Sequence, residues 1–320
     1  MFDVVALGEL LIDFTHIDTS HDGYPVLAAH PGGAPCNLLA AVAKFGRKSA
    51  LLGKVGNDQF GQMLRETLHG LNINTQGLIS DNNAFTTLAF VTLDGNGERT
   101  FSFARKPGAD MQIRPDELDL SVIKQSRIFH FGSLSLTHEP ARSATQAAVS
   151  YAKSLGKLIS FDPNLRPPLW DSLDTAKEQI FWGLKQADIV KISAEEVEFI
   201  CELDPKSGSQ WIMEECGAKL VFVTCGAEGC WYRNKFCYGH APAPRGLKII
   251  DTTGAGDIFG GAGLWKLIDL AKKPECLSEA ELVELTRFAC TAASLSTTKA
   301  GGISSVPDYD EVCALLQSTY

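Results

Sequence analysis

The sequence predicts an α/β fold in which helices flank a mostly parallel central sheet and a small second β-sheet covers a ligand site. Three observations support this fold. Short apolar runs of strand length recur along the chain, helical patterns separate most of them, and one stretch alternates like a hairpin. Alternation of buried strands and helices is typical of parallel sheets. The length of 320 residues suits one large domain with a smaller appendage.

The elements follow in chain order. Apolar runs predict buried strands at residues 4–7, 50–55, 128–131, 158–161, 189–192 and 220–224. Helical periodicity predicts helices at residues 35–45, 60–68, 141–155, 175–187, 278–298 and 309–318. Ligands of open α/β sheets bind at the carboxyl ends of the strands. We therefore expect the functional residues directly after these runs.

Residues 86–105 break the pattern, because they read as two alternating strands joined at Asp94, Gly95, Asn96 and Gly97. Together with a loop-like stretch at residues 16–30 they hold too little apolar material for a separate domain. We interpret them as a lid. The predicted division is residues 1–15, 32–85 and 113–320 for the large α/β domain, and 16–31 and 86–112 for the small β lid.

Composition narrows the function. The formal charge of −9 disfavours nucleic acid and anionic lipid as partners, and no segment approaches the roughly 20 apolar residues of a membrane-spanning helix. Asp3 and Glu9 stand where a secretory signal would be basic, so we expect a cytoplasmic protein. The nine cysteines match no common zinc spacing and are expected to be reduced thiols.

The segment DTTGAGD, residues 251–257, places a carboxylate at each end of a run of small residues. We expect a strand to end at Ile250 and a helix to begin near Asp257. Gly254, Ala255 and Gly256 would then offer unpaired amides to an anion. Asp257 suits the role of acceptor for a hydroxyl proton, and Asp251 suits cation ligation. A capped helix without a ligand explains the same segment, so this alternative stays open.

A second segment, HPGGAPCNLLAAVAKFG at residues 30–46, has the character of a polar ligand site. Gly32 and Gly33 allow close approach to the backbone, and Asn37 can donate and accept hydrogen bonds. Polyhydroxylated ligands need this mixture. A glycine turn before an ordinary helix is the structural alternative.

The common nucleotide motifs are missing. Residues 56–63 end in Gly61, Gln62 and Met63 where a Walker loop requires Gly-Lys-Ser/Thr, and no G-x-G-x-x-G follows the first strand. A standard P-loop NTPase and a dinucleotide dehydrogenase are both disfavoured.

The two glycine segments, in this order, resemble the ribokinase-like (PfkB) family of carbohydrate kinases. GGAPCNLLAAVAKFGRKSALLGKVGNDQFG is similar to the family's first signature and DTTGAGDIFGGAGL to its second. Three further segments resemble parts of the family pattern. Residues 8–14, GELLIDF, resemble its substrate-binding start, residues 191–196, KISAEE, its N-x-x-E magnesium motif, and residues 223–229, VTCGAEG, its adenine-side strand and turn. The resemblance covers nearly the whole chain. It implies a ribokinase-like fold and phosphoryl transfer from ATP, with Mg²⁺, to a sugar hydroxyl.

Within the family, FDPNLRPPLW at residues 161–170 most resembles fructokinases. Kinases for aminoimidazole riboside, 2-keto-3-deoxygluconate or ribose share several of these segments and stay as alternatives. A catalytically silent sugar- or nucleotide-binding protein on the same fold is the alternative from another class. The sequence leaves open whether the lid also forms a homodimer contact.

The resemblance also implies roles for individual residues. Asp257 is the expected base and residues 254–256 the anion hole. The sugar is expected to contact Asp13, Gly32, Gly33 and Asn37, with Arg105 adding charge near the acceptor. ATP is expected near Arg166, Ser193, Thr224, Gly226 and Gly229. Mg²⁺ is expected at Glu196 and Asp251, and K⁺ at Asp251, Thr253, Ser296, Lys299, Gly301 and Ser305. Ser193 departs from the Asn frequent in the family.

Overall fold

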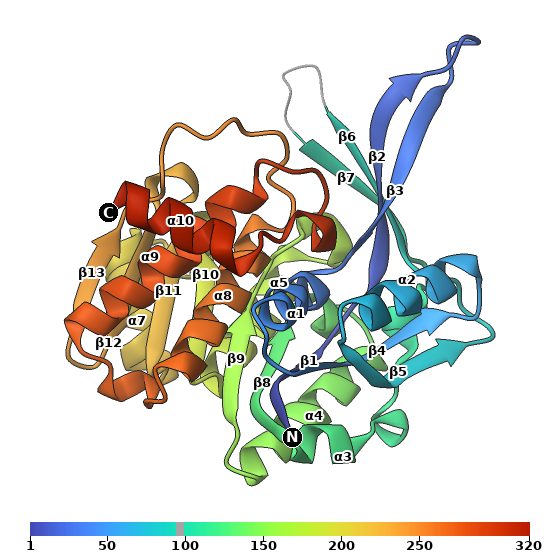
Figure 1. The fold of residues 1–320 in the computed structure, drawn as a ribbon. Helices are drawn as coiled ribbons and strands as arrows, with labels where there is room; N and C mark the ends of the chain where they lie inside the picture. The colour runs from blue at the N-terminus through green and yellow to red at the C-terminus, as the bar shows by residue number, and fades with distance from the viewer. Residues whose placement is uncertain (94–98) are drawn as a thin grey trace.

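The computed structural model describes residues 1–93 and 99–320, and in this part the chain forms two sheets (Figure 1). The larger sheet has the strand order β13-β12-β11-β10-β9-β8-β1-β4-β5 and is parallel except at β12 and β13. Its strands are β1 (Phe2–Leu7), β4 (Ser49–Gly56), β5 (Asn74–Asp81), β8 (Ser126–Gly132), β9 (Leu158–Asp162), β10 (Ile189–Ser193), β11 (Leu220–Thr224), β12 (Cys230–Asn234) and β13 (Tyr238–Ala241). The predicted mostly parallel sheet is confirmed.

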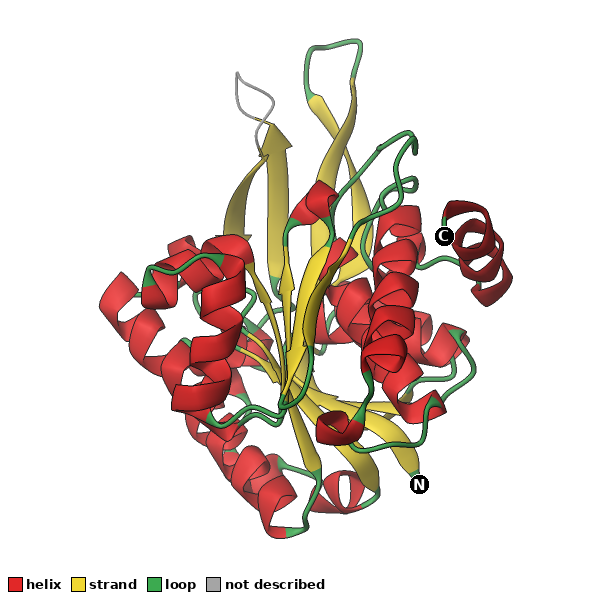
Figure 2. Ribbon diagram, turned by 90° about the vertical axis from the view of Figure 1, so that its left-hand side faces the viewer, coloured by secondary structure: helices red, strands yellow, loops and turns green. Residues whose placement is uncertain are grey.

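Helices cover both faces of this sheet, as Figure 2 shows. One hydrophobic core packs against α1 (Ala34–Lys44), α2 (Gln59–Gly70), α8 (Ala255–Asp269), α9 (Glu279–Ser296) and α10 (Tyr309–Thr319). The other core involves α3 (Leu120–Lys124), α4 (Ala141–Ser154), α5 (Leu173–Gln186), α6 (Ala194–Cys201) and α7 (Pro205–Cys216). Burial on both faces explains why the central strands read as continuous apolar runs.

The second sheet has the order β3-β2-β6-β7 and projects from the body (Figure 1). Its strands are β2 (Leu11–Thr19), β3 (Pro25–Gly32), β6 (Leu88–Leu93) and β7 (Arg99–Ala104). The two strands of the hairpin are as predicted, and the proposed turn at Asp94, Gly95, Asn96 and Gly97 lies outside the described residues. Residues 16–30, assigned to the lid as a loop-like stretch, instead form paired strands of this sheet. Exposed side chains from Ile17 onward hide the alternation, but backbone pairing with β3 holds the strand.

The chain crosses from one sheet to the other between β1 and β2. A side-chain carbon added to Gly8 would lie 2.5 Å from Pro35 Cγ, so the crossing packs tightly against the start of α1. Glu9 lies in this crossing, and Asp13 follows it on β2, opposite His30 of β3. The crossing and the base of the second sheet therefore place two carboxylates near the carboxyl end of β1.

One predicted strand is wrong. The apolar run that ends at Ile250 forms no strand, and the side chains of Ile249 and Ile250 are 63% and 59% exposed. An apolar run cannot reveal whether it fills a core or borders an open cavity. Here Ile249 borders a cavity described below.

All nine cysteines lie in the described part of the chain and are free thiols, as predicted. Within residues 1–93 and 99–320, no helix combines the length and the apolar character that crossing a membrane requires.

Candidate active site

The site forms where α8 begins. Gly254 precedes the helix with a φ of +76°, a conformation that favours glycine, and the helix starts at Ala255, two residues earlier than predicted. Asp257 is therefore the third residue of the helix, with its side chain beside the helix N-terminus. In the described part of the chain the backbone N–H groups of Gly256 and Asp257 have no acceptor, whereas that of Ala255 donates to the Thr252 carbonyl (3.3 Å). Two amides of the predicted anion hole are thus available to a ligand.

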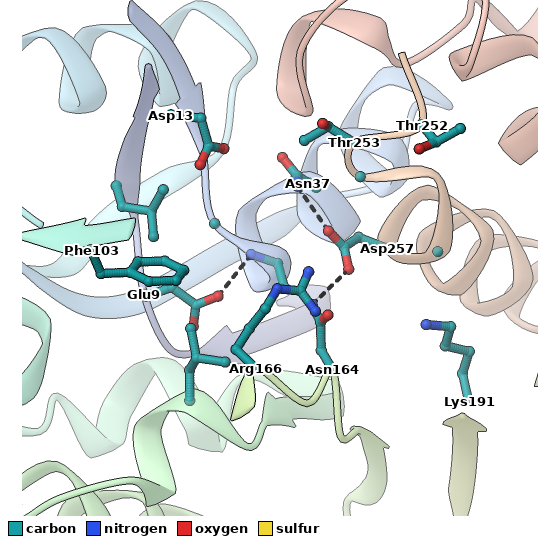
Figure 3. Close-up of a pocket in the computed structure, with 16 residues that line it drawn as sticks. Glu9, Asp13, Asn37, Phe103, Asn164, Arg166, Lys191, Thr252, Thr253 and Asp257 are labelled. Carbon is teal, nitrogen blue, oxygen red and sulfur yellow. Dashed lines mark hydrogen bonds between the residues drawn. The ribbon is translucent and has the colours of Figure 1, made fainter. Parts of the chain in front are cut away.

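Two amide side chains hold the carboxylate of Asp257. Asn37 on α1 donates to Oδ2 (2.8 Å), and Asn164, just after β9, donates to Oδ1 (3.1 Å) (Figure 3). Burial raises the pKa of Asp257, while Lys191, the hydrogen bond from Asn37, and Arg166 lower it. A fixed carboxylate with a raised pKa suits a general base that works near neutral pH.

Asp257 borders a cavity of about 350 Å³ between the two sheets. Asp13 and Asn37 provide polar groups, and three apolar side chains complete another part of the wall: Leu11, Phe103 and Leu134. The side-chain amide oxygen of Asn37, Oδ1, is buried and has no hydrogen-bond partner among the described residues. Polar groups around an apolar wall match a sugar, whose hydroxyl groups surround carbon-bound hydrogens.

Asp13 faces this cavity from the base of the second sheet. It is 8% exposed, and burial raises its pKa to about 7 although Arg166 lowers it. Gly32 on the neighbouring strand leaves room for it, because a side-chain carbon there would lie 2.2 Å from Asp13 Oδ2. Gly33 then caps α1 with a φ of +113° and borders the cavity itself.

A second cavity, of about 750 Å³, lies along the carboxyl ends of the later strands. Thr224, Gly226 and Gly229 border it, as do apolar groups of Leu247, Ile249 and Phe259. Thr252 and Gly256 border both cavities. The predicted anion hole therefore lies where the two cavities meet.

The two predicted arginines have different surroundings. Arg166 borders the smaller cavity, on the side of Asp13 and Asp257 rather than beside Thr224. Arg105 is 4% exposed and lies outside both cavity walls. Its guanidinium pairs with Asp110 (2.7 Å) and donates to the Thr137 hydroxyl and the Leu134 carbonyl, both at 3.1 Å. Arg105 thus ties the end of β7 to the large domain instead of facing an acceptor.

Ser193 and Glu196 form a capping box at the start of α6. Glu196 also accepts the backbone N–H of Leu165 at 2.6 Å, so its carboxylate is fixed and buried. No group of three His, Cys, Asp or Glu side chains in the described residues suits a metal ion. Mg²⁺ bound to phosphate oxygens and water usually takes only one or two carboxylates from the protein, and the fixed carboxylate of Glu196 is of this kind.

The predicted cation loop is brought together around Asp251. Its Oδ1 accepts the N–H of Thr253 (2.8 Å) and its Oδ2 accepts the N–H of Gly301 (2.9 Å). Ser296 and Ser305 are buried, and their hydroxyls donate to the carbonyls of Ala293 and Gly302, respectively. The ammonium of Lys299 instead pairs with Glu311 at the surface (3.2 Å). Lys299 could therefore bind a cation only through its backbone carbonyl oxygen.

Sequence reasoning missed several residues of the smaller cavity. Glu9 borders it, accepts the N–H of Ala34 (2.8 Å), and has a pKa that burial raises to about 7. Asn164 and Lys191 also border it. Both lie inside segments that the resemblance includes, DPNLR and KISAEE. A lysine within an otherwise apolar strand was a signal that could have been used.

Comparisons with known proteins agree with this geometry. Residues 1–309 match the model of the pfkB family carbohydrate kinases. Fructokinase-2 of Solanum lycopersicum is 43% identical, covering 98% of this chain and 96% of that protein. The crystal structure of Xylella fastidiosa fructokinase with bound ATP is 30% identical with a TM-score of 0.91, covering 99% of both chains.

A double mutant of Vibrio cholerae O395 fructokinase, with fructose, ADP and a potassium ion bound, is 30% identical with a TM-score of 0.87. The alignment covers 98% of both chains. The family model spans nearly the whole chain, and the two sheets, the paired glycine segments and the site between them are all present. The chain belongs to the pfkB family of carbohydrate kinases.

Proposed function

We propose that this protein is an ATP-dependent fructokinase. It transfers the γ-phosphoryl group of ATP to a hydroxyl of fructose. The observation that carries this function is the position of Asp257, a buried carboxylate next to Gly256, where two cavities meet, one suited to a sugar and one to a nucleotide. The fructokinases named above, with ATP in one structure and fructose, ADP and potassium in another, support this choice of substrates.

In this mechanism the sugar lies in the smaller cavity against Asp13 and Asn37. Asp257 accepts the proton of the attacking hydroxyl, while the N–H groups of Gly256 and Asp257 face the charge on the moving phosphoryl group. Phosphoryl transfer has a loose transition state, so placement and electrostatics provide most of the catalysis. Glu196 would hold Mg²⁺ through water, and the metal would neutralise charge on the phosphates.

The site also favours this function over a binding role. A protein that only binds sugar or nucleotide does not need a carboxylate beside an anion hole, because a carboxylate repels phosphate. Two amide donors nevertheless hold Asp257 at this place. A carboxylate fixed beside an anion hole is useful in catalysis, because it can accept the proton of the attacking sugar hydroxyl.

A coupled assay of ADP release tests the function. Fructose, ribose, 2-keto-3-deoxygluconate, fructose 6-phosphate and nucleosides including aminoimidazole riboside are compared, with a reaction without sugar as the baseline. We expect fructose to give the highest kcat/KM. A different best acceptor would overturn the sugar assignment, and ADP release that no acceptor stimulates would overturn the kinase assignment.

Three further expectations belong to this proposal. The second sheet acts as the lid that covers the sugar cavity. Exposed apolar side chains on it, including Ile17 and Tyr24, favour a homodimer contact, which light scattering of the purified protein tests. A reducing cytoplasm is the expected location, consistent with nine free thiols.

A further inference from the structure

Lys191 is a buried cation that the proposed mechanism does not yet use. It is the third residue of β10, in a strand whose neighbours Val190 and Ile192 are fully buried. Its side chain is 12% exposed, and its ammonium lies 3.0 Å from Oδ2 and 3.3 Å from Oδ1 of Asp162. Removing an ammonium from water is costly, so a buried lysine needs compensation or a function.

The ammonium also lies beside the anion hole. A side-chain carbon placed on Gly256 would be 2.8 Å from Lys191 Nζ, so the ammonium is next to the first turn of α8. Figure 3 shows Lys191 rising from the end of its strand towards the helix that carries Asp257. Lys191 and Gly256 both border the smaller cavity, and Gly256 also borders the larger one. The cation is thus at the place where the cavities meet.

The charges around Lys191 exceed what a simple ion pair requires. Burial lowers its pKa, but the carboxylates of Asp162, Glu196 and Asp257 together raise it above the ordinary value, so the ammonium stays charged. Lys191 and Arg166 both act on these carboxylates, so two cations face three carboxylates, and this end of the site is short of positive charge before any substrate binds. A triphosphate that enters with its metal ion adds more negative charge there.

We propose that Lys191 is a catalytic residue whose ammonium contacts the phosphoryl group in transit, beside the N–H groups of Gly256 and Asp257. The inference rests on the proposed kinase function. In the step, the sugar oxygen forms a bond to the γ-phosphorus, the bond from that phosphorus to the β–γ bridging oxygen breaks, and ADP leaves. The hydroxyl proton goes to Asp257. Lys191 exchanges no proton and stabilises equatorial charge.

A purely structural role is the competing explanation. In that case Lys191 only neutralises Asp162, and removing both charges together should restore activity. The two explanations differ in the double variant. We therefore compare Lys191→Met, Asp162→Asn and the double variant Lys191→Met/Asp162→Asn, with thermal unfolding of each as a check on folding.

We expect Lys191→Met to lower kcat by roughly 10²- to 10³-fold, the usual loss for one donor to a developing anion. The double variant leaves neither member of the Lys191–Asp162 pair without its partner, so it should fold and remain as slow as Lys191→Met. KM for the sugar and the Kd of ADP should change little. If the kcat of the double variant came within about tenfold of the kcat of Asp162→Asn, the proposal would be overturned. A nearly normal kcat for Lys191→Met would overturn it as well.

A binding measurement gives a readout independent of turnover. ADP with aluminium fluoride and the best sugar mimics the phosphoryl group in flight, and the double variant should bind this mixture far more weakly than Asp162→Asn does. Equal binding would contradict the proposal. The sugar panel is run first on the unaltered protein, so a different sugar preference changes only the acceptor used. If no sugar stimulates ADP release, the proposed function fails before Lys191 is tested.

Discussion

Asn37 donates a 2.8 Å hydrogen bond to Asp257 although 220 residues separate the two along the chain. The bond joins the first turns of α1 and α8, the helices that carry the two glycine-rich segments. Each segment alone has an ordinary structural explanation. Their contact joins them into one site, and it lowers the pKa of the carboxylate, which burial raises.

Replacing Asp257 with asparagine should lower kcat by roughly 10²- to 10⁴-fold, because the general base is lost. The Kd of ATP should stay nearly unchanged, since the amides of the anion hole remain. Steady-state ADP release and nucleotide titration provide the measurements. Asp269→Asn near the other end of α8, where the carboxylate is 42% exposed, serves as the matched control. A variant that keeps more than about a tenth of normal kcat would remove Asp257 from the role of base.

Replacing Asn37 with leucine should move the acid limb of the kcat–pH profile to higher pH. The hydrogen bond from Asn37 favours the ionised form of Asp257, so its loss adds to the raised pKa that burial causes. The base then becomes ionised only at higher pH, and part of the lost rate should return in alkaline buffer. A pH series of kcat at saturating sugar decides this, and an unshifted acid limb would contradict the coupling.

Glu9 predicts a stability that depends on pH. Burial raises its pKa from 4.5 to about 7, so the folded protein binds the proton more tightly than the unfolded chain. The resulting stabilisation, about 3 kcal/mol at most, is complete below pH 4.5 and is lost as the pH rises through about 7. Glu9→Gln should flatten this part of the profile while still accepting the N–H of Ala34. Urea unfolding at a series of pH values between 4.5 and about 7 measures the free energy of unfolding of both proteins. The same dependence on pH in Glu9→Gln and the unaltered protein would contradict the prediction.

Arg105→Ala should destabilise the fold by about 3–5 kcal/mol, because Asp110 is left as a buried charge without its cation. The pair joins the end of β7 to the large domain, with side chains that are 2% and 4% exposed. Arg114→Ala, whose partner Asp116 is at the surface, is the control and should change little. Urea unfolding compares the two variants. A loss no larger than that of the control would show that Arg105 does not hold the sheet in place.

Activity should be higher in K⁺ than in a bulky ammonium salt of the same ionic strength. Asp251 accepts the N–H of Gly301, and a side-chain carbon on Gly254 would lie 3.0 Å from Gly302 Cα, so this loop is next to the anion hole. Asp251→Asn should reduce both the rate and its dependence on K⁺. Initial rates in the two salts provide the test. Equal rates for the unaltered protein would take the monovalent cation out of the mechanism.

Much of this architecture could be predicted because its signals are local. Strands buried on both faces read as apolar runs, and the paired glycine segments reveal the helix starts that carry Asn37 and Asp257. The strands β2 and β3 were missed because their exposed outer halves lack alternation. Their pairing depends on the backbone of neighbouring strands.

The remaining site residues depend on distant contacts. Ile249 and Ile250 have the composition of a strand, yet they lie in an exposed segment. The alternating pattern that ends at Arg105 does not predict that Asp110 is its ion-pair partner. Lys191 becomes meaningful only when β10 lies beside the start of α8, which no spacing within KISAEE can indicate.

The junction at Thr252 and Gly256 has a consequence for the order of events. In the proposed reaction, donor and acceptor would occupy two cavities with a common border, so the phosphoryl group could pass directly between them without being carried by a side chain. The reaction should therefore proceed through a ternary complex of enzyme, ATP and sugar. Double-reciprocal plots of rate against one substrate at several concentrations of the other should give intersecting lines and not parallel ones. Separate chambers also let either product depart first, so each product should inhibit without the other being present.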